Sequence, residues 1–278
     1  WPPPSGIEYR VDVLSAFVLL LVSAVSAVMM PFARRSVAFE IEGDKQAWFY
    51  TMYQLCLAGL LGITITGDAF NAFVFLEISS LSTYVLIAMG KDRRALLASY
   101  QYLIMGTIGA TFYVIGVGLI YLLTGSLNIV DIAGRLGPAT ADQFRPAMAA
   151  LAFLTVGISL KLALFPLHVW LPNAYAYAPS FATAFLAATA TKVAVYLLLR
   201  FLFSVFGVAV GANALQISEL LLALSLAAMF IASILAIYEE NVKRMLAYSS
   251  VAQIGYITFG ISLANKSGLT GGIVHLFN

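Results

Sequence analysis

The chain has 278 residues, of which 62% are hydrophobic and 10% charged, with a mean hydropathy of +0.94 and a formal net charge of +2. Soluble domains carry about a quarter charged residues, so this composition excludes an ordinary soluble domain. The small net charge gives no argument for nucleic acid, which we do not expect as a partner, and one cysteine with two widely separated histidines argues against a structural metal site. We therefore expect a lipid bilayer to solvate most of the chain.

Apolar runs of about 20 residues, the length that crosses a bilayer as a helix, follow one another along the whole chain. Isolated runs of this kind are helical in a membrane, whereas a barrel would show short alternating segments. The sequence thus predicts an all-α, polytopic transmembrane helix bundle with eight spans and a truncated ninth that begins near residue 268. The spans are 12–33, 46–67, 69–89, 95–124, 146–170, 180–206, 216–238 and 245–264.

The ends of the sequence resemble interior positions of a longer protein. The first residues, WPPPSG, contain neither an initiator methionine nor the basic start of a signal peptide, and GGIVHLFN stops inside an apolar pattern. We expect residues 1–278 to be a single transmembrane domain fragment.

Two segments depart from plain spanning helices. In LKLALFPLHVWLPNAYAYAP, Pro166, Pro172 and Pro179 remove backbone donors near the end of a span, which predicts a discontinuous helix. A proline-rich exit loop is the alternative. The polar stretch GSLNIVDIAGRLGPATADQFRP is interpreted as a surface loop with a short interfacial helix.

Basic residues of the short loops fall unevenly on the two sides of the predicted bundle. By the rule that basic loops stay in the cytoplasm, loop 34–45 is predicted to be cytoplasmic in a multi-pass protein of the cell inner membrane. The richer side holds Arg34, Arg35, Lys45, Lys91, Arg93, Arg94, Lys243 and Arg244, and the other holds Arg10, Arg135, Arg145, Arg200 and Lys266.

Three charged residues, Glu77, Lys161 and Lys192, lie deep inside the predicted spans. Each ionised group costs roughly 2.5–3.5 kcal/mol at such a depth, so all three must face the bundle interior or an aqueous cavity. A buried lysine next to a mobile carboxylate can accept and release protons. The alternative is a static clip between helices, but buried pairs are weak evidence for stability and Lys192 has no obvious acid.

Three further residues are candidates for proton transfer. His168 lies seven residues after Lys161 and would share its helical face if the helix continued past Pro166; it would otherwise cap broken-helix carbonyls. His275 is a lone histidine of the last apolar segment and a relay candidate. Asp68 is expected to cap the following helix, with a proton entrance as the alternative.

The remaining polar groups carry little signal. Cys56 lies in the apolar run YQLCLAGLLG and is interpreted as a small core residue. Serines and threonines within the spans, including Ser80, are interpreted as ordinary helix-packing residues. No nucleophile–base pair, nucleotide loop or metal cluster is visible, so we expect no catalytic site and no cofactor.

Four segments together resemble the antiporter-like, proton-translocating membrane subunits: GDAFNAFVFLEISSLSTYVLIA, SLKLALFPLHVWLPNAYAYAPS, ATKVAVYLLLRF and ENVKRMLAYSSVAQIGYI. That family includes the large subunits of Mrp-type sodium/proton antiporters, three subunits of respiratory complex I, and relatives in membrane-bound hydrogenases. The resemblance runs from about residue 7 to the end. FNAFVFLEIS and TGSLNIVDIA look most like the D-type subunit of Mrp antiporters, with a complex I or hydrogenase subunit as the alternative.

The resemblance implies a 14-helix fold with two inverted five-helix repeats, of which 46–206 would be the first and 216–278 the start of the second. It implies that Glu77 tunes Lys161 of the broken helix, and that protons pass through Lys192 toward His275. It also implies other membrane subunits as partners, with protons and sodium transported. Whether the whole complex is an antiporter or a redox-driven translocase stays open.

Overall fold

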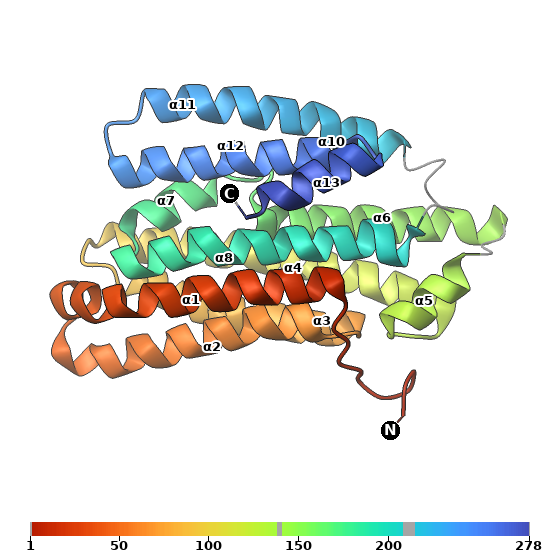
Figure 1. The fold of residues 1–278 in the computed structure, drawn as a ribbon, viewed down its shortest axis with the longest axis horizontal. Coiled ribbons are helices and arrows are strands. Elements are labelled where there is room, and N and C mark those ends of the chain that lie inside the picture. The colour runs from red at the N-terminus through yellow and green to blue at the C-terminus, as the bar shows by residue number, and fades with distance from the viewer. Residues whose placement is uncertain (1, 138–140, 208–214, 278) are drawn as a thin grey trace.

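A computed structural model of the chain describes residues 2–137, 141–207 and 215–277. The described residues form a bundle of long helices that run roughly parallel to one another (Figure 1). The α-helices are α1 Val13–Glu40, α2 Gln46–Ile65, α3 Ala69–Ala88, α4 Arg94–Thr124, α5 Ile129–Leu136, α6 Ala141–Leu162, α7 Trp170–Tyr177, α8 Ser180–Leu199, α10 Leu215–Ala227, α11 Ser233–Ile237, α12 Val242–Ser262 and α13 Lys266–His275. The predicted all-α fold is confirmed.

Short polar side chains set where several helices begin. Asp12 accepts a hydrogen bond from the Ser15 amide at the start of α1, at 2.9 Å. Asn128, Asn241 and Asn265 cap α5, α12 and α13 in the same way. Each cap satisfies amide groups that the first helical turn leaves unpaired.

Within the described residues, seven helices are long and apolar enough to cross a membrane, and they correspond to the first seven predicted runs. The first of them continues to Glu40, seven residues beyond the predicted end of its run. The eighth run, 245–264, forms α12 but does not belong to this set. Its first turn carries Lys243 and Arg244, and Gln253 lies near its middle, which makes it less apolar.

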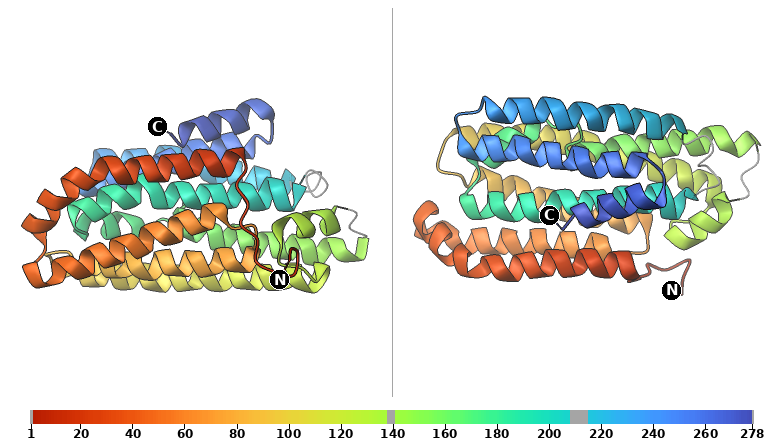
Figure 2. Two further views of the ribbon diagram at one scale, coloured as in Figure 1. Left: turned by 60° about the horizontal axis from the view of Figure 1, so that its bottom comes forward. Right: turned by 45° about the horizontal axis from the view of Figure 1, so that its top comes forward.

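The helices pack in a few close pairs. The pair α4 and α6 makes the most extensive contact, α3 lies between α2 and α4, and α1 packs on α8. The helices α10 and α11 form one rod through a π-helical segment, Ala228–Ala232, and lie with α12 along one side of the bundle (Figures 1 and 2). Lys161 and His168, two of the residues predicted to be functional, are buried between these helices.

Successive connections alternate between the two ends of the bundle, as consecutive spanning helices require. The α1–α2, α3–α4, α7–α8 and α11–α12 connections meet at the left end in Figure 1. There the Ser180 amide donates to Glu40 at 2.9 Å, and Lys243 Nζ donates to the Ala178 carbonyl at 3.0 Å. The richer basic set therefore gathers at one end; which side of the membrane this end faces stays a prediction.

At the opposite end, one arginine ties three helices together. Arg200 pairs with Asp12 and donates to Ser15 at 2.8 Å, while its Nε donates to Tyr196 Oη at 2.9 Å. Tyr196 in turn donates to the Thr64 carbonyl of α2 at 2.9 Å. The bond from Arg200 lowers the pKa of Asp12 to about 2, so this carboxylate stays ionised at physiological pH.

The discontinuous helix is present. Helix α6 ends at Leu162, where Ala163 adopts the left-handed conformation with φ of 59°, and helix resumes only at Trp170. The indole Nε1 of Trp170 donates to the Leu160 carbonyl at 3.0 Å, a carbonyl that also accepts from the Ala163 amide at 3.3 Å. The apolar run therefore continues eight residues beyond the end of the helix it contains.

The surface segment after α4 contains the short helix that the sequence predicts, α5. The division into repeats, 46–206 and 216–278, stays a prediction.

Candidate functional site

The structure brings Glu77 of α3 and Lys161 of α6 together inside the bundle. Lys161 Nζ lies 3.7 Å from Glu77 Oε1, and the two side chains are 6% and 23% exposed. A separation of 3.7 Å is an ion pair but is too long for a hydrogen bond. The two side chains therefore form an open ion pair, that is, an ion pair without a direct hydrogen bond between them.

Small residues allow α6 to approach α4, which also packs on α3. A β-carbon at Gly157 of α6 would lie 2.7 Å from the Gly109 carbonyl oxygen of α4, closer than real contacts allow. Because α4 also packs on α3, this tight contact brings the last turn of α6, which carries Lys161, to the polar face of α3. Glu77 and Ser80 lie one turn apart on that face.

The closest polar contact of Lys161 is Ser80, which the sequence alone suggests is an ordinary helix-packing residue. Lys161 Nζ donates to Ser80 Oγ at 2.5 Å, and Ser80 Oγ donates to the Leu76 carbonyl at 2.7 Å. Tyr84, one turn further along α3, brings its hydroxyl to the same place. The signal that could have found both is spacing, because Ser80 and Tyr84 follow Glu77 by three and seven residues.

A small cavity borders the ion pair on the side of α8. Its volume is about 10 Å³, and its lining includes Glu77, Lys161, Ala194 and Leu197. This volume is at the lower limit for one water molecule. The ion pair thus faces the helix that carries Lys192.

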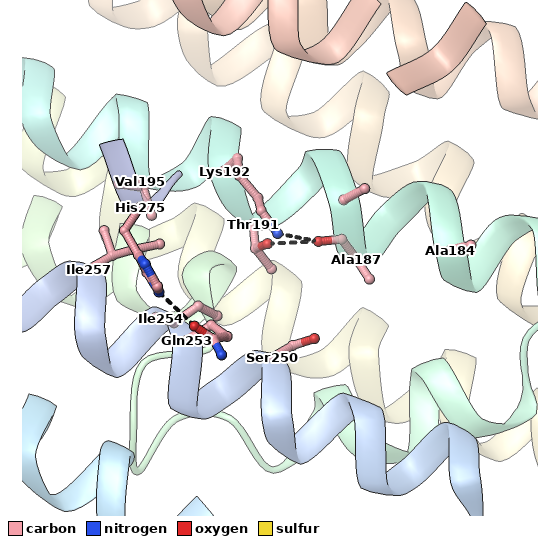
Figure 3. A pocket seen from close by; sticks show the side chains of 11 residues that line it. Ala184, Ala187, Thr191, Lys192, Val195, Ser250, Gln253, Ile254, Ile257 and His275 are labelled. Atoms are coloured by element: carbon pink, nitrogen blue, oxygen red, sulfur yellow. Dashed lines mark hydrogen bonds between the residues drawn. The ribbon is translucent and has the colours of Figure 1, made fainter. Parts of the chain in front are cut away.

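Lys192 and His275 line a second, larger cavity of about 280 Å³ between α8, α12 and α13 (Figure 3). Lys192 Nζ donates to the Ala187 carbonyl of its own helix at 2.8 Å. His275 Nε2 pairs with Gln253 Oε1 at 2.6 Å. The structure therefore places the second lysine and the last histidine in one cavity, separate from the cavity at Lys161.

His168 lies in the segment between α6 and α7. Because α6 ends at Leu162, the helix does not continue past Pro166, and the condition under which His168 would share a helical face with Lys161 is not met. The imidazole is buried, stacks on Phe165 at 5.2 Å and meets the edge of Tyr248 at 6.3 Å between ring centres. Within the described residues its Nδ1 has no hydrogen-bond partner.

Asp68 caps α3, as the sequence predicts. Its Oδ1 accepts from the Asn71 amide at 2.7 Å, and burial raises the pKa of this carboxyl. Asp68 also lines an open cavity of about 610 Å³ together with Asp131 and Arg135. Its role as a proton entrance stays a prediction.

Cys56 is buried, as expected of a core residue, and contacts Thr83 Oγ1 at 3.4 Å.

Residues 66–278 match the family described as NADH:quinone oxidoreductase/Mrp antiporter, TM. The chain belongs to this family. The match covers both charged residues of the ion pair, the broken helix and the cavity at Lys192.

Similar proteins within the family come from two kinds of complex. The chain is 43% identical over its full length to NADH-quinone oxidoreductase subunit N of Desulforudis audaxviator, covering 54% of that protein. It is 31% identical to the D-type subunit of the Na(+)/H(+) antiporter of Alkalihalophilus pseudofirmus, over 99% of this chain and 54% of the relative.

A solved structure shares the fold along the whole chain. It is the membrane-bound sulfane sulfur reductase, an archaeal respiratory membrane complex, matched with a TM-score of 0.90 at 34% identity over 100% of this chain and 55% of the other. The chain thus spans about half the length of the relatives that it matches.

Proposed function

We propose that this chain carries protons across a membrane as an antiporter-like subunit of a multisubunit complex. The supporting observation is the open ion pair of Glu77 and Lys161, enclosed between α3, α4 and α6. A carboxylate and an ammonium at this depth oppose insertion by several kcal/mol in total, and apolar side chains of similar size pack without that cost. A proton-transfer role explains why both groups are present.

The proposed cycle begins with a proton on the Lys161 amine. Approach of Glu77 stabilises the ammonium, and withdrawal destabilises it, because charges attract strongly away from water. The proton then leaves toward α8, whose Ala194 and Leu197 border the cavity at the ion pair. Lys192 and His275 are the proposed next stations, since they share one cavity.

The proposed test replaces each member of the pair in the full-length protein within its complex. In inverted membrane vesicles, Glu77→Ala and Lys161→Ala should reduce the proton gradient, followed by a pH-sensitive dye, to the level of vesicles lacking the complex. Lys45→Ala is the matched control, because Lys45 pairs with Glu42 at 2.6 Å at an exposed site. Wild-type transport by an assembled Lys161→Ala complex would refute the proposal.

The complex itself is proposed to be a sodium/proton antiporter of the Mrp type, as the FNAFVFLEIS and TGSLNIVDIA segments indicate. The second candidate is a redox-driven complex, which the higher identity to an NADH-quinone oxidoreductase subunit favours, 43% against 31%. The two differ in what sodium does. Antiport predicts that adding sodium to energised vesicles collapses the proton gradient through this complex, whereas a redox-driven pump requires an electron donor and builds the gradient without sodium.

A further inference from the structure

The hydroxyl of Tyr84 is buried without a hydrogen bond. Tyr84 is 6% exposed, and within the described residues its Oη has no partner. An unsatisfied hydroxyl in a protein interior costs about 1–3 kcal/mol, and phenylalanine would fill the same space without that cost. A buried polar group left unpaired in one state of a protein calls for a partner in another.

Tyr84 Oη lies beside the ammonium of Lys161. A β-carbon built on Gly106 of α4 would overlap Tyr84 Oη and would lie 3.4 Å from Lys161 Nζ, so both atoms occupy the space above that glycine. On α3, residues 77, 80 and 84 lie on one face at helical spacing. Lys161 therefore faces a carboxylate, a serine and a phenol in succession.

The three groups differ in what they can offer a lysine that has lost its proton. A neutral amine has a lone pair that needs a donor, and an ionised Glu77 can only accept. The single hydrogen of Ser80 is already donated to the Leu76 carbonyl. The hydroxyl of Tyr84 makes no hydrogen bond among the described residues, although it lies near Ser80.

We propose that Tyr84 is a positioning residue for proton release, whose hydroxyl donates to the neutral amine of Lys161. Lys161 is held by Ser80 and Glu77 while charged, and by Tyr84 after its proton has left. The inference rests on the proposed function, since it assigns Tyr84 to the same proton-transfer step.

The other groups around Lys161 leave this donor role to Tyr84. From α4, Tyr113 donates its hydroxyl to the Ala69 carbonyl at 3.0 Å, and Tyr102 packs its ring edge-to-face on Tyr84 at 4.8 Å. The residues of α8 that share the cavity with Lys161 are apolar. From α7, Trp170 stacks on Tyr102 at 4.0 Å and donates its Nε1 to a backbone carbonyl.

The first test is Tyr84→Phe in the full-length protein within its complex, measured as the initial rate of proton transport against pH. Without its donor the neutral amine is disfavoured, so Lys161 releases its proton less readily and the pH profile moves upward. One hydrogen bond of about 1 kcal/mol corresponds to a shift of roughly 0.7 pH unit and a rate about fivefold lower on the acidic limb. Assembly and thermal stability should be equal to wild type or better, because the lost hydroxyl has no partner.

Tyr53→Phe is the matched control. Tyr53 is a buried tyrosine of α2 whose hydroxyl pairs with Ser26 at 2.5 Å, remote from the ion pair in sequence and hydrogen bonding. Loss of that hydrogen bond should lower stability and leave the pH profile unchanged.

A second measurement replaces Tyr84 with 3-fluorotyrosine, whose hydroxyl is a stronger donor. The pH profile should then move downward, opposite to the phenylalanine variant. An unchanged profile in both variants, or a downward shift in Tyr84→Phe, would overturn the proposal, the latter because it would make Tyr84 an acceptor for the ammonium. If Lys161→Ala abolishes transport while both Tyr84 variants behave as wild type, the proposed function stands and only this inference fails.

Discussion

Around the ion pair, the packing leaves no space for even one added carbon atom at Gly106. Gly106 faces Tyr84 and Lys161 with no room for a side chain, whereas Gly118, three turns further along the same helix, has nothing within 4 Å of a β-carbon. The two glycines lie in the same helix but differ in their surroundings. Comparing an alanine substitution at each therefore distinguishes the steric effect of the added carbon from the change in helix propensity.

We predict that Gly106→Ala destabilises the protein by about 1–3 kcal/mol, because the added carbon displaces Tyr84 or Lys161. Gly118→Ala should be neutral or stabilise by up to about 1 kcal/mol, because alanine favours helix. Thermal unfolding of both variants in detergent measures the difference. Equal unfolding temperatures would show that Tyr84 and Lys161 move aside freely.

At this scale the sequence identifies the charged residues of the candidate site but not the hydroxyl-bearing residues beside them. Glu77 and Lys161 are recognisable in the sequence because placing an ionised side chain in a membrane costs free energy, and the structure pairs them. Ser80 and Tyr84 did not, because hydroxyl groups occur in many membrane helices and bond to their own backbone. Only the three-dimensional contact distinguishes Ser80 from neighbours such as Ser82, which donates to the Ile78 carbonyl.

Among the helices, the indole of Trp170 bridges the break between α6 and α7. Trp170 begins α7, stacks on Tyr102 of α4 and donates to the Leu160 carbonyl of α6. This single side chain joins both halves of the broken helix to α4. Since Leu160 precedes Lys161, the bond also fixes the backbone from which the lysine extends.

We predict that Trp170→Phe lowers the free energy of unfolding by about 1 kcal/mol or more, because it deletes the bond to a buried carbonyl but keeps an aromatic ring. Proton transport should fall as well, since the Lys161 backbone loses an anchor. Trp48→Phe is the control, because Trp48 is 63% exposed. Parallel thermal unfolding and vesicle assays check both effects, and two variants indistinguishable from wild type would remove Trp170 from this role.

Prolines predicted the break correctly, because they remove amide donors that a helix needs. They did not predict where helix ends, since Leu162 precedes Pro166 by four residues. For this reason the condition for His168 to be a helical neighbour of Lys161 is not met. The end of α6 is set by the backbone at Ala163 and by contacts with Trp170, which are tertiary and invisible in a single sequence.

Considered as a whole, the molecule has two chemically different ends. One end gathers most loop arginines and lysines, and the other closes on the Asp12–Arg200 pair. The only cysteine of the chain, Cys56, is buried, so surface cysteines can be introduced one at a time against a silent background.

We predict that Asp44→Cys, at the basic end, is protected from a membrane-impermeant maleimide in intact cells and reacts after the cells are opened. Gly134→Cys, in α5 near the other end, should react in intact cells. Both positions are exposed in the structure, so reactivity reports the side of the membrane. The reverse pattern would invert the orientation predicted from basic loops.

At this scale the sequence predicts the order of the spans but not which helices touch. Of the eight complete runs it predicts, seven correspond to helices of the described residues that are long and apolar enough to cross a membrane. Consecutive spanning helices place their connections at alternate ends of the bundle, and most of the basic loop residues lie at one of these ends. The cavity shared by Lys192 and His275 depends on how α12 and α13 pack beside α8, and residues more than 80 positions apart carry no mark of that proximity.

The interruption of α6 has an electrostatic consequence for the lysine beside it. Peptide dipoles add along a helix, so its final turn carries about half a negative charge on unpaired carbonyls. Lys161 occupies the last turn of α6, where this partial charge is nearest. An unbroken helix would place the same lysine where neighbouring dipoles cancel, so the break supplies a fixed counter-charge from the backbone alone. In the proposed cycle, Glu77 modulates a cation that the main chain already favours.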